Sequence, residues 1–439
     1  MRLNAPRAPL RSLDDALVAL LAQARPLPGT ESVATFEADG RVLAEDLVSP
    51  LQVPPQDNSS MDGYAVRSAE IADEGVPLAV SQRIPAGAAA QPLQPGTAAR
   101  IFTGAPVPAG ADAIVMQEDT EALDDGRVRI LRVPEPGQWI RRSGEDITRG
   151  STVLARGQRI GPAAQGLAAS IGRDRLLVAR RPRVALFSTG DELVMPGQVA
   201  PEAMRPGAIY NSNRFFLRSL LARLGCEVQD LGIVPDRREA TLEALRDASA
   251  SNDLILTSGG VSVGEEDHIK PSVQQLGALD LWQISMKPGK PFAFGWIAKQ
   301  SSRGNTARAD DGTPSPTLPR QAGEGSSTYF IGLPGNPVSS FVTFLLLVRP
   351  FLLQLQGATR LEAQAVHLPA HFDWPRPDRR REFLRARRNA EGGLELFPNQ
   401  SSGVLTSTVW ADGLIDVPGG QAIARGDLVR FLPLAELLA

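Results

Sequence analysis

The residues best suited to chemistry follow a short apolar run. Residues 253–258, "DLILTS", read as a buried strand, and they open into the glycine-rich stretch "GGVSVGEEDHIK" at 259–270. A strand that ends in such a loop usually presents backbone N–H groups to a phosphate. This loop, however, carries three acids (265–267) before it reaches Lys270. Carboxylates can lie beside phosphate-binding amides if a divalent cation lies between them, because hard cations take oxygen ligands from protein and phosphate together.

Two of these acids have a simpler explanation. Glu265 and Glu266 fit the role of solvated loop residues as well as that of metal ligands. Asp267 and Lys270 fall where a helix begins, and there a functional role is the better interpretation. A single glycine-rich loop is a weak indication of phosphate binding, so the other loops must be considered with it.

Further loops carry side chains of the same kinds. "TGDEL" (189–193) follows the strand-like "RVALFS", "PDR" (235–237) follows "CEVQDLGIV", and "KPGKP" (287–291) follows "LWQISM". In a parallel α/β sheet, ligands bind beyond the carboxyl ends of the strands, where such loops meet. The acids would hold Mg²⁺, while Lys287 and Lys290, on either side of a turn, would act as point charges on an oxyanion.

The elements that position these loops alternate from residue 183 onward. Apolar strand-like runs alternate with helix-like segments such as "SNRFFLRSLLARLG" and "DRREATLEALRDASA". This alternation predicts a three-layer α/β domain with a mostly parallel sheet. Before it, short β-type runs broken by Pro and Gly predict small β-rich domains, and the C-terminal part is typical of a small β-barrel or sandwich. The expected fold class is therefore multidomain, α/β plus β.

We expect five segments along the chain. They are an N-terminal helix within 1–26 that packs on the α/β domain, a β-rich linker domain formed by 27–54 and 139–180, a second β-rich domain at 55–138, the α/β domain at 181–358, and a C-terminal β domain at 359–439. Within the α/β domain, residues 299–327 are polar and rich in Gly, Ser, Thr and Pro. We predict that they form a disordered insertion in a surface hairpin, without a catalytic role.

Composition argues against several classes of protein. Lys and Arg number 46 against 49 Asp and Glu, and this near-neutral charge argues against a protein that coats nucleic acid. The single cysteine, Cys226, excludes an intrachain disulfide and a cage of thiolate metal ligands. The N-terminus lacks the apolar core of a signal peptide, and the longest apolar run, 341–348, is too short to span a bilayer. We therefore expect a soluble cytoplasmic protein with no membrane partner.

Seven motifs occur together and in order. They are "PPQDNSSMDGYAVR" (54–67), "FTGAPVPAGADAIVMQED" (102–119), "RRSGEDI" (141–147), "VALFSTGDEL" (184–193), "SGGVSVGEEDHIK" (258–270), "KPGKPFAFG" (287–295) and "GLPGNPVSS" (332–340). This set closely resembles the molybdopterin molybdenumtransferases, the MoeA family, which includes the E domain of gephyrin. The resemblance is specific over most of the chain and only general over the C-terminal domain.

The resemblance implies a reaction and an assembly. Members of that family insert molybdate into the dithiolene of molybdopterin, starting from the adenylylated pterin, and release AMP in a reaction that requires Mg²⁺. They are elongated homodimers whose cleft lies between the α/β domain of one subunit and the second β-rich domain of the other. Expected partners also include the molybdopterin adenylyltransferase and the enzymes that accept the finished cofactor.

The resemblance also assigns roles by position. The implied catalytic residues are Asp62, Thr103, Asp146, Glu192, Asp236, Asp267, Lys287 and Lys290, and the implied metal ligands are Glu192, Asp236 and Asp267. The implied substrate-binding residues are Thr189, Gly190, Ser258, Gly259, Gly260, Lys270, Pro291 and Pro334. Mg²⁺ is the expected cofactor, and molybdate is a substrate.

Two other functions are compatible with parts of the sequence. The upstream enzyme that adenylylates molybdopterin resembles the α/β domain alone, whereas the additional motifs "MDGYA" and "FTGA" favour the later step. The other alternative is a non-catalytic scaffold like gephyrin, and the intact set of acids and lysines argues against it. Asp62 and Thr103 could also do no more than fix turns, because Asp-Gly and Thr-Gly are common turn pairs.

Overall fold

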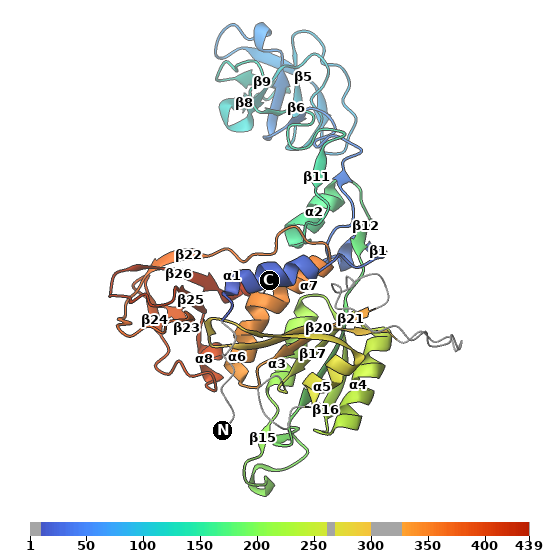
Figure 1. Cartoon of the computed structure of the whole chain (residues 1–439). Helices are drawn as coiled ribbons and strands as arrows, with labels where there is room; N and C mark the ends of the chain where they lie inside the picture. Colours follow the sequence, from blue (N-terminus) through green and yellow to red (C-terminus); the bar gives the residue numbers. More distant parts are fainter. Residues whose placement is uncertain (1–9, 261–267, 300–326, 439) are drawn as a thin grey trace, which may run out of the picture.

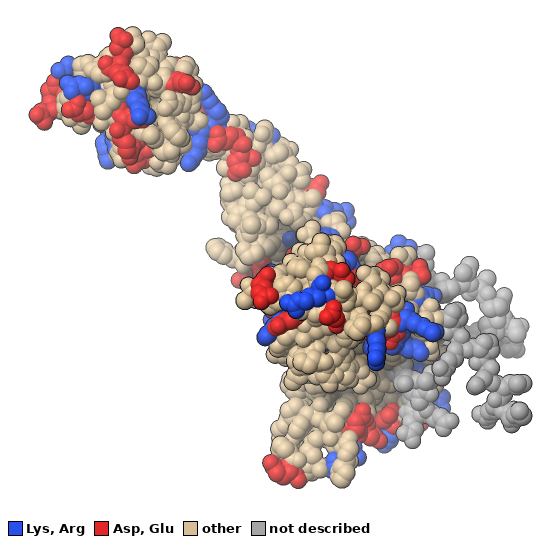
Figure 2. Space-filling view, turned by 90° about the vertical axis from the view of Figure 1, so that its left-hand side faces the viewer, with Lys and Arg blue, Asp and Glu red and all other residues tan. Residues whose placement is uncertain are grey.

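The computed structural model describes residues 10–260, 268–299 and 327–438. The molecule is elongated, with a distal β domain, a narrow stalk and a wider body (Figure 1). In the body, an α/β domain lies beside a C-terminal β domain. Acidic and basic side chains are interspersed on the face shown in Figure 2, so no patch of a single sign dominates this side of the molecule.

A six-stranded sheet forms the centre of the α/β domain. Its order is β16 (Glu227–Val234), β13 (Arg183–Thr189), β17 (Leu254–Ser258), β21 (Ser327–Leu333), β20 (Pro291–Ala298) and β18 (Gly277–Gln283). The first four strands are mutually parallel, β20 pairs antiparallel with β21, and β18 pairs antiparallel with β20. The carboxyl ends of the four parallel strands therefore lie at one edge, which we call the carboxyl edge.

Helices cover both faces of this sheet because alternate strand residues point to opposite sides. Val184 and Leu186 of β13 pack in one core with helices α1 (Leu13–Gln23), α3 (Asn213–Arg223) and α7 (Arg349–Leu355). Ala185 and Phe187 pack on the other side with α4 (Arg238–Ser251) and α5 (Ile269–Leu276). Both faces are thus buried, as expected for a three-layer α/β domain.

One continuous helical segment supplies much of the first core. It consists of α6 (Pro337–Thr343), a π-helical stretch (Phe344–Val348) and α7. Its 19 residues have the length and apolarity of a membrane span, and it extends beyond the apolar run 341–348 at both ends. However, 89% of its most apolar window is buried inside the protein, where the segment packs against the sheet.

The distal domain holds a second six-stranded sheet. Its order is β7 (Ala113–Met116), β4 (Gly63–Val66), β6 (Thr97–Ile101), β5 (Pro77–Ile84), β9 (Arg127–Ile130) and β8 (Thr120–Ala122). The stalk beneath it contains the pairs β1 (Thr30–Ala34) with β12 (Arg175–Ala179) and β2 (Leu47–Val48) with β11 (Thr152–Leu154), together with α2 (Pro162–Ser170). The short pair β3 (Asn58–Ser59) and β10 (Ile140–Arg141) joins the stalk to the distal domain.

The C-terminal domain is built on a third sheet. Its order is β19 (Met286–Lys287), β23 (Arg381–Arg388), β25 (Gly413–Val417), β26 (Leu428–Pro433) and β22 (Val366–Pro369), and β24 (Leu394–Leu396) also pairs with β23. This domain also contains two short helices, α8 (Thr406–Trp410) and α9 (Leu434–Leu437). In the α/β domain, a small pair of strands, β14 (Leu193–Val194) and β15 (Ile209–Tyr210), projects from the body. Because β19 belongs to the α/β part of the sequence, this sheet links the two domains.

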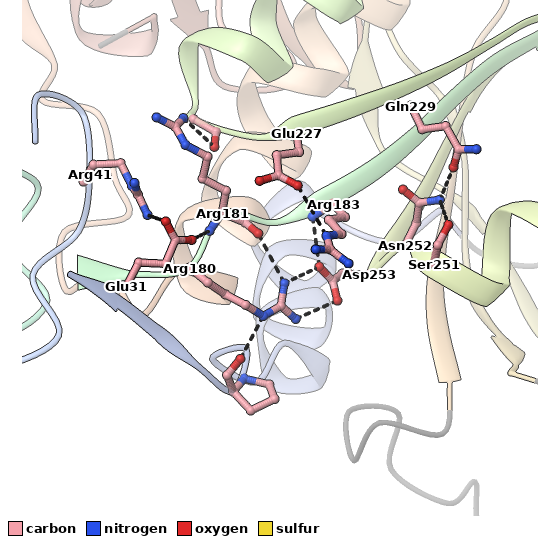
Figure 3. Close-up of polar contacts among 12 residues, drawn as sticks. Glu31, Arg41, Arg180, Arg181, Arg183, Glu227, Gln229, Ser251, Asn252 and Asp253 are labelled. Atoms are coloured by element: carbon pink, nitrogen blue, oxygen red, sulfur yellow. Dashed lines mark hydrogen bonds and ion pairs between the residues drawn. The ribbon is translucent and has the colours of Figure 1, made fainter. Parts of the chain in front are cut away.

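Ion pairs hold the stalk against the amino ends of the α/β strands (Figure 3). Arg180 follows β12 and donates two hydrogen bonds of 2.8 Å to the two carboxylate oxygens of Asp253, which precedes β17. Glu31 of β1 pairs with Arg41 at 3.1 Å and accepts a hydrogen bond from the Arg181 N–H. The stalk thus joins the sheet at the edge opposite the carboxyl edge.

The fold class expected from the sequence, α/β plus β in several domains, is confirmed. β20 and β21 pair antiparallel up to Ala298 and Ser327, so they form the hairpin in which the insertion was placed. The predicted disorder of that insertion falls on residues 300–326, outside the described residues.

Candidate active site

Three loops meet at the carboxyl edge, and glycines allow their close approach. The Gly259 N–H donates to the Leu333 carbonyl at 3.1 Å, and the Ser188 and Ser258 hydroxyls lie 3.3 Å apart. Gly259 has a φ of +92°, and a Cβ there would lie 2.9 Å from the Thr189 carbonyl oxygen. Residues with a side chain rarely adopt this backbone conformation, so glycine is needed both for the turn and for the close contact with Thr189.

The next glycine and the "PGNP" turn close the base of the same region. A Cβ on Gly260 would lie 2.9 Å from the Thr189 hydroxyl and 2.6 Å from Ile269, at the start of α5. The Asn213 side-chain amide donates to the Gly335 carbonyl at 2.7 Å, which fixes the turn that follows Pro334. Thr189, Ser258, Gly259, Gly260 and Pro334 are therefore brought together as one backbone-lined surface.

The predicted metal ligands are only partly described. A Cβ on Gly190 would lie 2.5 Å from Glu192 Oε2, so the exposed Glu192 side chain folds back over the loop after β13. Asp236 is half-buried and follows β16, the strand next to β13. Asp267 lies outside the described residues. Among the residues that are described, no three His, Cys, Asp or Glu side chains lie close enough to one another to hold a metal ion.

The "KPGKP" turn packs tightly against the long helical segment. A Cβ on Gly289, at a φ of +107°, would collide with the Thr343 hydroxyl. Thr343 immediately precedes the π-helical stretch, and its buried hydroxyl has no hydrogen-bond partner within the described structure. Single π-helical turns occur frequently at functional sites, because they disturb the regular hydrogen bonds of a helix. The turn is thus fixed relative to the carboxyl edge.

The two lysines of this turn have different surroundings. Lys287 Nζ lies 3.0 Å from Glu382 Oε1 and 3.6 Å from Asp378 Oδ2, both in the C-terminal domain. Lys290 is half-buried, and no carboxylate of the described chain lies within 4 Å of its ammonium group. Lys270 is also half-buried and belongs to the first turn of α5. Pro291 begins β20.

The remaining predicted residues lie in the distal domain and the segment that leads to it. Asp62 Oδ1 accepts hydrogen bonds of 2.8 Å from both the Thr103 N–H and the Thr103 hydroxyl. The first of these bonds is the main reason that the pKa of Asp62 is lowered, so this carboxyl is ionised at neutral pH. Asp146 is exposed, and its N–H donates to the Val53 carbonyl at 3.0 Å. None of the three can reach the carboxyl edge of its own chain, because the stalk extends from the opposite edge (Figure 1).

A cavity of about 870 Å³ lies elsewhere, between α1, the long helical segment and the C-terminal sheet. Its lining includes Leu17, Arg349 and Phe383 and none of the predicted site residues. Position at the strand ends, rather than cavity volume, therefore identifies the candidate site.

Comparison with known proteins agrees with this architecture. Residues 11–172 match the MoeA N-terminal region (domain I and II), residues 185–354 a probable molybdopterin binding domain, and residues 367–434 the MoeA C-terminal region (domain IV). The chain is 39% identical to the molybdopterin molybdenumtransferase of Haemophilus influenzae over 82% of this chain and 80% of that protein. It is 35% identical to the protein of the same name from Nostoc sp. over 92% of this chain and 89% of that one.

The chain belongs to the molybdopterin molybdenumtransferase family. A solved structure of the MoeA protein from Pyrococcus horikoshii OT3 has the same fold, with a TM-score of 0.78 and 26% identity over 97% of this chain and 100% of that one. Gephyrin of Dictyostelium discoideum is 34% identical over 74% of this chain and 47% of its own length. The family and the enzymatic role in molybdenum cofactor biosynthesis that the motifs indicated are thus confirmed.

One further residue that suits an anion site lies outside all of the motifs. Arg385 of β23 is 1% exposed, and among the described residues its guanidinium donates to the Ser407 hydroxyl and the carbonyls of Phe383 and Ser401. Burial lowers its pKa to about 10, and no carboxylate of the described chain lies within 4 Å of it. The only sequence signal was an arginine inside an otherwise buried strand.

Arg385 is connected to the carboxyl edge through residues 400–403. The Ser401 carbonyl accepts a hydrogen bond from the Arg385 guanidinium. The neighbouring Ser402 carbonyl accepts one of 3.0 Å from the N–H of Val338, in the first turn of α6. A buried cation destabilises the fold unless an anion lies beside it. In a molybdenumtransferase this arrangement suits an anionic substrate.

Proposed function

We propose that this protein inserts molybdate into the dithiolene of molybdopterin, starting from the adenylylated pterin and releasing AMP. Two observations support the proposal: the glycine-lined loops at the carboxyl edge, and the contacts with α6 made by the segments that carry Lys290 and Arg385. These two cations lack carboxylate partners in the described structure. The first feature suits a pyrophosphate, and the second suits a tetrahedral oxyanion.

The chain's own residues would act mainly by binding and orientation. Gly259 and Gly260 carry no side chains of their own, so the backbone of this loop can approach the phosphates closely. Lys287, Lys290 and Arg385 would hold molybdate near the pterin sulfurs. Bringing two anions together is the costly step, and cations fixed in advance by the fold lower that cost before any bond changes.

The donor set fits Mg²⁺. Glu192 and Asp236 follow adjacent parallel strands and supply hard oxygen ligands, while Asp267 stays a prediction from the sequence. Mg²⁺ is commonly bound by one or two carboxylates together with substrate phosphates, so a complete protein cage is not required. When bound, Mg²⁺ would neutralise negative charge on the pyrophosphate whose cleavage releases AMP.

We further propose that the working site requires a second copy of the chain. Asp62, Thr103 and Asp146 lie beyond the stalk, and the stalk leaves the sheet from the edge opposite the site (Figure 1). In a two-fold dimer the distal domain of one copy could approach the carboxyl edge of the other. Ionised Asp62 would then face the reactants of its partner.

The test is a reaction with defined components. Purified protein, adenylylated molybdopterin, Mg²⁺ and molybdate should yield AMP and a cofactor that activates an apo-molybdoenzyme. Failure to release AMP under these conditions would contradict the proposal. A parallel reaction with ATP and free molybdopterin should give no adenylylation, and product there would point to the upstream step instead.

A further inference from the structure

Glu382 is a buried carboxylate at the border of two domains, and both of its oxygens accept hydrogen bonds. Its side chain is 1% exposed. One oxygen accepts Lys287 Nζ at 3.0 Å, and the other accepts the Trp374 indole N–H at 2.9 Å and the Asp378 N–H at 2.8 Å. In the described part of the chain, Lys287 is the only cation within 4 Å of this carboxylate.

The backbone fixes this contact from both sides. β19 and β23 pair in parallel, and their register places Lys287 opposite Glu382. Trp374 and Asp378 hold the second oxygen of Glu382, so the carboxylate cannot rotate without losing hydrogen bonds. The long lysine side chain, which is flexible when free, is therefore held at one end by a rigid acceptor.

The charges around Lys287 nearly cancel. Asp378 lies 3.6 Å from Lys287 Nζ and is also paired with Arg380 at 2.8 Å. The hydrogen bond from the Arg380 side chain is the main reason that the pKa of Asp378 lies far below its ordinary range. Two cations and two carboxylates thus form a cluster without net charge. Lys287 brings a directed N–H donor to the site, whereas Lys290 brings a charge that no carboxylate within the described ranges compensates.

We infer that Glu382 is a positioning residue for the reaction, which holds the Lys287 ammonium group in the orientation that receives the oxyanion. The inference rests on the proposed function, because it assumes that Lys287 faces molybdate. It adds a specific role for the C-terminal domain, which would orient a donor that belongs to the α/β part of the chain.

The direction in which Glu382→Gln changes the KM for molybdate distinguishes a positioning role from a purely electrostatic one. In Glu382→Gln the shape is kept and one negative charge is removed. If only charge mattered, the KM for molybdate would fall, because an oxyanion would bind a more positive site. If Glu382 positions Lys287, the KM should rise and kcat/KM should fall by about tenfold or more. A lower KM would overturn the inference.

A double-substitution cycle tests whether Glu382 acts through Lys287. In a Lys287→Met background, Glu382→Gln should change kcat/KM for molybdate less than twofold, because the donor that it orients is gone. An effect of undiminished size in that background would show a general structural role and overturn the inference. Glu395→Gln is the matched control, since Glu395 of β24 pairs with the exposed Arg387 at the other end of β23 and should leave the kinetics unchanged.

A spectroscopic measurement separates this inference from the proposed function. The chain has five tryptophans, and ¹⁹F NMR of protein labelled with 5-fluorotryptophan, with Trp374→Phe for assignment, can follow the indole bonded to Glu382. Molybdate alone should shift the Trp374 signal in the otherwise unaltered protein and not in Lys287→Met. An unshifted signal in protein that still binds molybdate and releases AMP would overturn the inference and leave the function intact.

Discussion

At the scale of single residues, the candidate site depends on glycines at positions where a side chain would not fit. Gly259, Gly260 and Gly289 all have positive φ values, and a Cβ on each would meet neighbouring atoms. Such positions bring backbone N–H groups and turns closer together than side chains would allow. The chemistry of the loops therefore depends on these glycines as much as on the acids and lysines.

Gly260→Ala should impair substrate binding. Its φ of +65° and the Cβ distances of 2.9 Å to Thr189 and 2.6 Å to Ile269 predict a loss of about 1–2 kcal/mol in local stability. We expect a raised KM for the adenylylated pterin in steady-state assays of AMP release. Gly166→Ala is the control, because Gly166 lies on the exposed side of α2, where an added Cβ would have no neighbouring atom within 4 Å, and it should be neutral or slightly stabilising.

Arg385→Met should reduce transfer more than stability. Within the described structure the buried guanidinium has no carboxylate partner, so its removal leaves no unpaired acid behind. Relief of the cost of burying a charge offsets the hydrogen bonds lost at Ser407, Phe383 and Ser401. We expect the thermal unfolding midpoint to change little, while kcat/KM for molybdate falls at least a hundredfold, in line with the loss of a charged hydrogen-bond donor at a reacting group. A variant that unfolds but whose folded fraction reacts normally would assign Arg385 to stability alone.

At the scale of elements, the contact between the stalk and β17 is electrostatic. Burial, the largest single influence, opposes ionisation of Asp253, but hydrogen bonds from Arg180 and the Arg183 N–H and the charge of Arg180 outweigh it. The pKa of Asp253 is therefore lowered. A carboxyl with a lowered pKa in the folded state stabilises the fold above its unfolded-state pKa and loses this effect as the pH falls through the folded-state value.

Asp253→Asn should consequently destabilise the protein at neutral pH and much less in acid. Removing one partner of this partly buried pair is expected to cost about 2 kcal/mol near pH 7. Thermal unfolding of both proteins from pH 7 down to pH 3 should show the difference shrinking below about pH 4. A pH-independent difference would mean that the ion pair is not the cause. Asp125→Asn removes an exposed pair with Arg127 and should have little effect at any pH.

At the scale of the whole molecule, the elongated shape separates the two halves of the predicted site. Asp62 and Thr103 form a preorganised acceptor at one end, and the glycine loops and cations lie beyond the stalk at the other (Figure 1). A chain folded in this way cannot bring the halves together by itself. Assembly of two copies therefore becomes part of the catalytic proposal.

Mixed dimers test this division directly. Asp62→Ala and Lys290→Ala should each be inactive alone, whereas co-expressed subunits should recover about a quarter of normal activity, because half of randomly formed dimers contain one intact cleft. Co-expression of Asp62→Ala with Thr103→Ala is the matched control. Both of its clefts are damaged, so it should stay inactive. Full activity of either single variant would contradict the assignment of that residue.

The sequence by itself determined the family, the order of the elements and the chemical types of residue at the strand ends. These features are local: alternating strand and helix patterns, glycine-rich turns and short motifs can be recognised without knowing which segments meet. The loops at residues 189, 258–260 and 334 converge because parallel strands place their carboxyl ends at one edge, a regularity that a sequence pattern can predict.

Only the tertiary structure decided which charges are compensated. Lys287 and Lys290 look equivalent in "KPGKP", yet one is paired with an acid 95 positions away and the other has no carboxylate near it in the described structure. The surroundings of Arg385 and the separation of Asp62 from the carboxyl edge could not be predicted from the sequence either, because contacts between distant segments produce no periodic pattern in the chain. Whether a charge is neutralised depends on which distant segments fold against it, and this determines how strongly it can bind an anion.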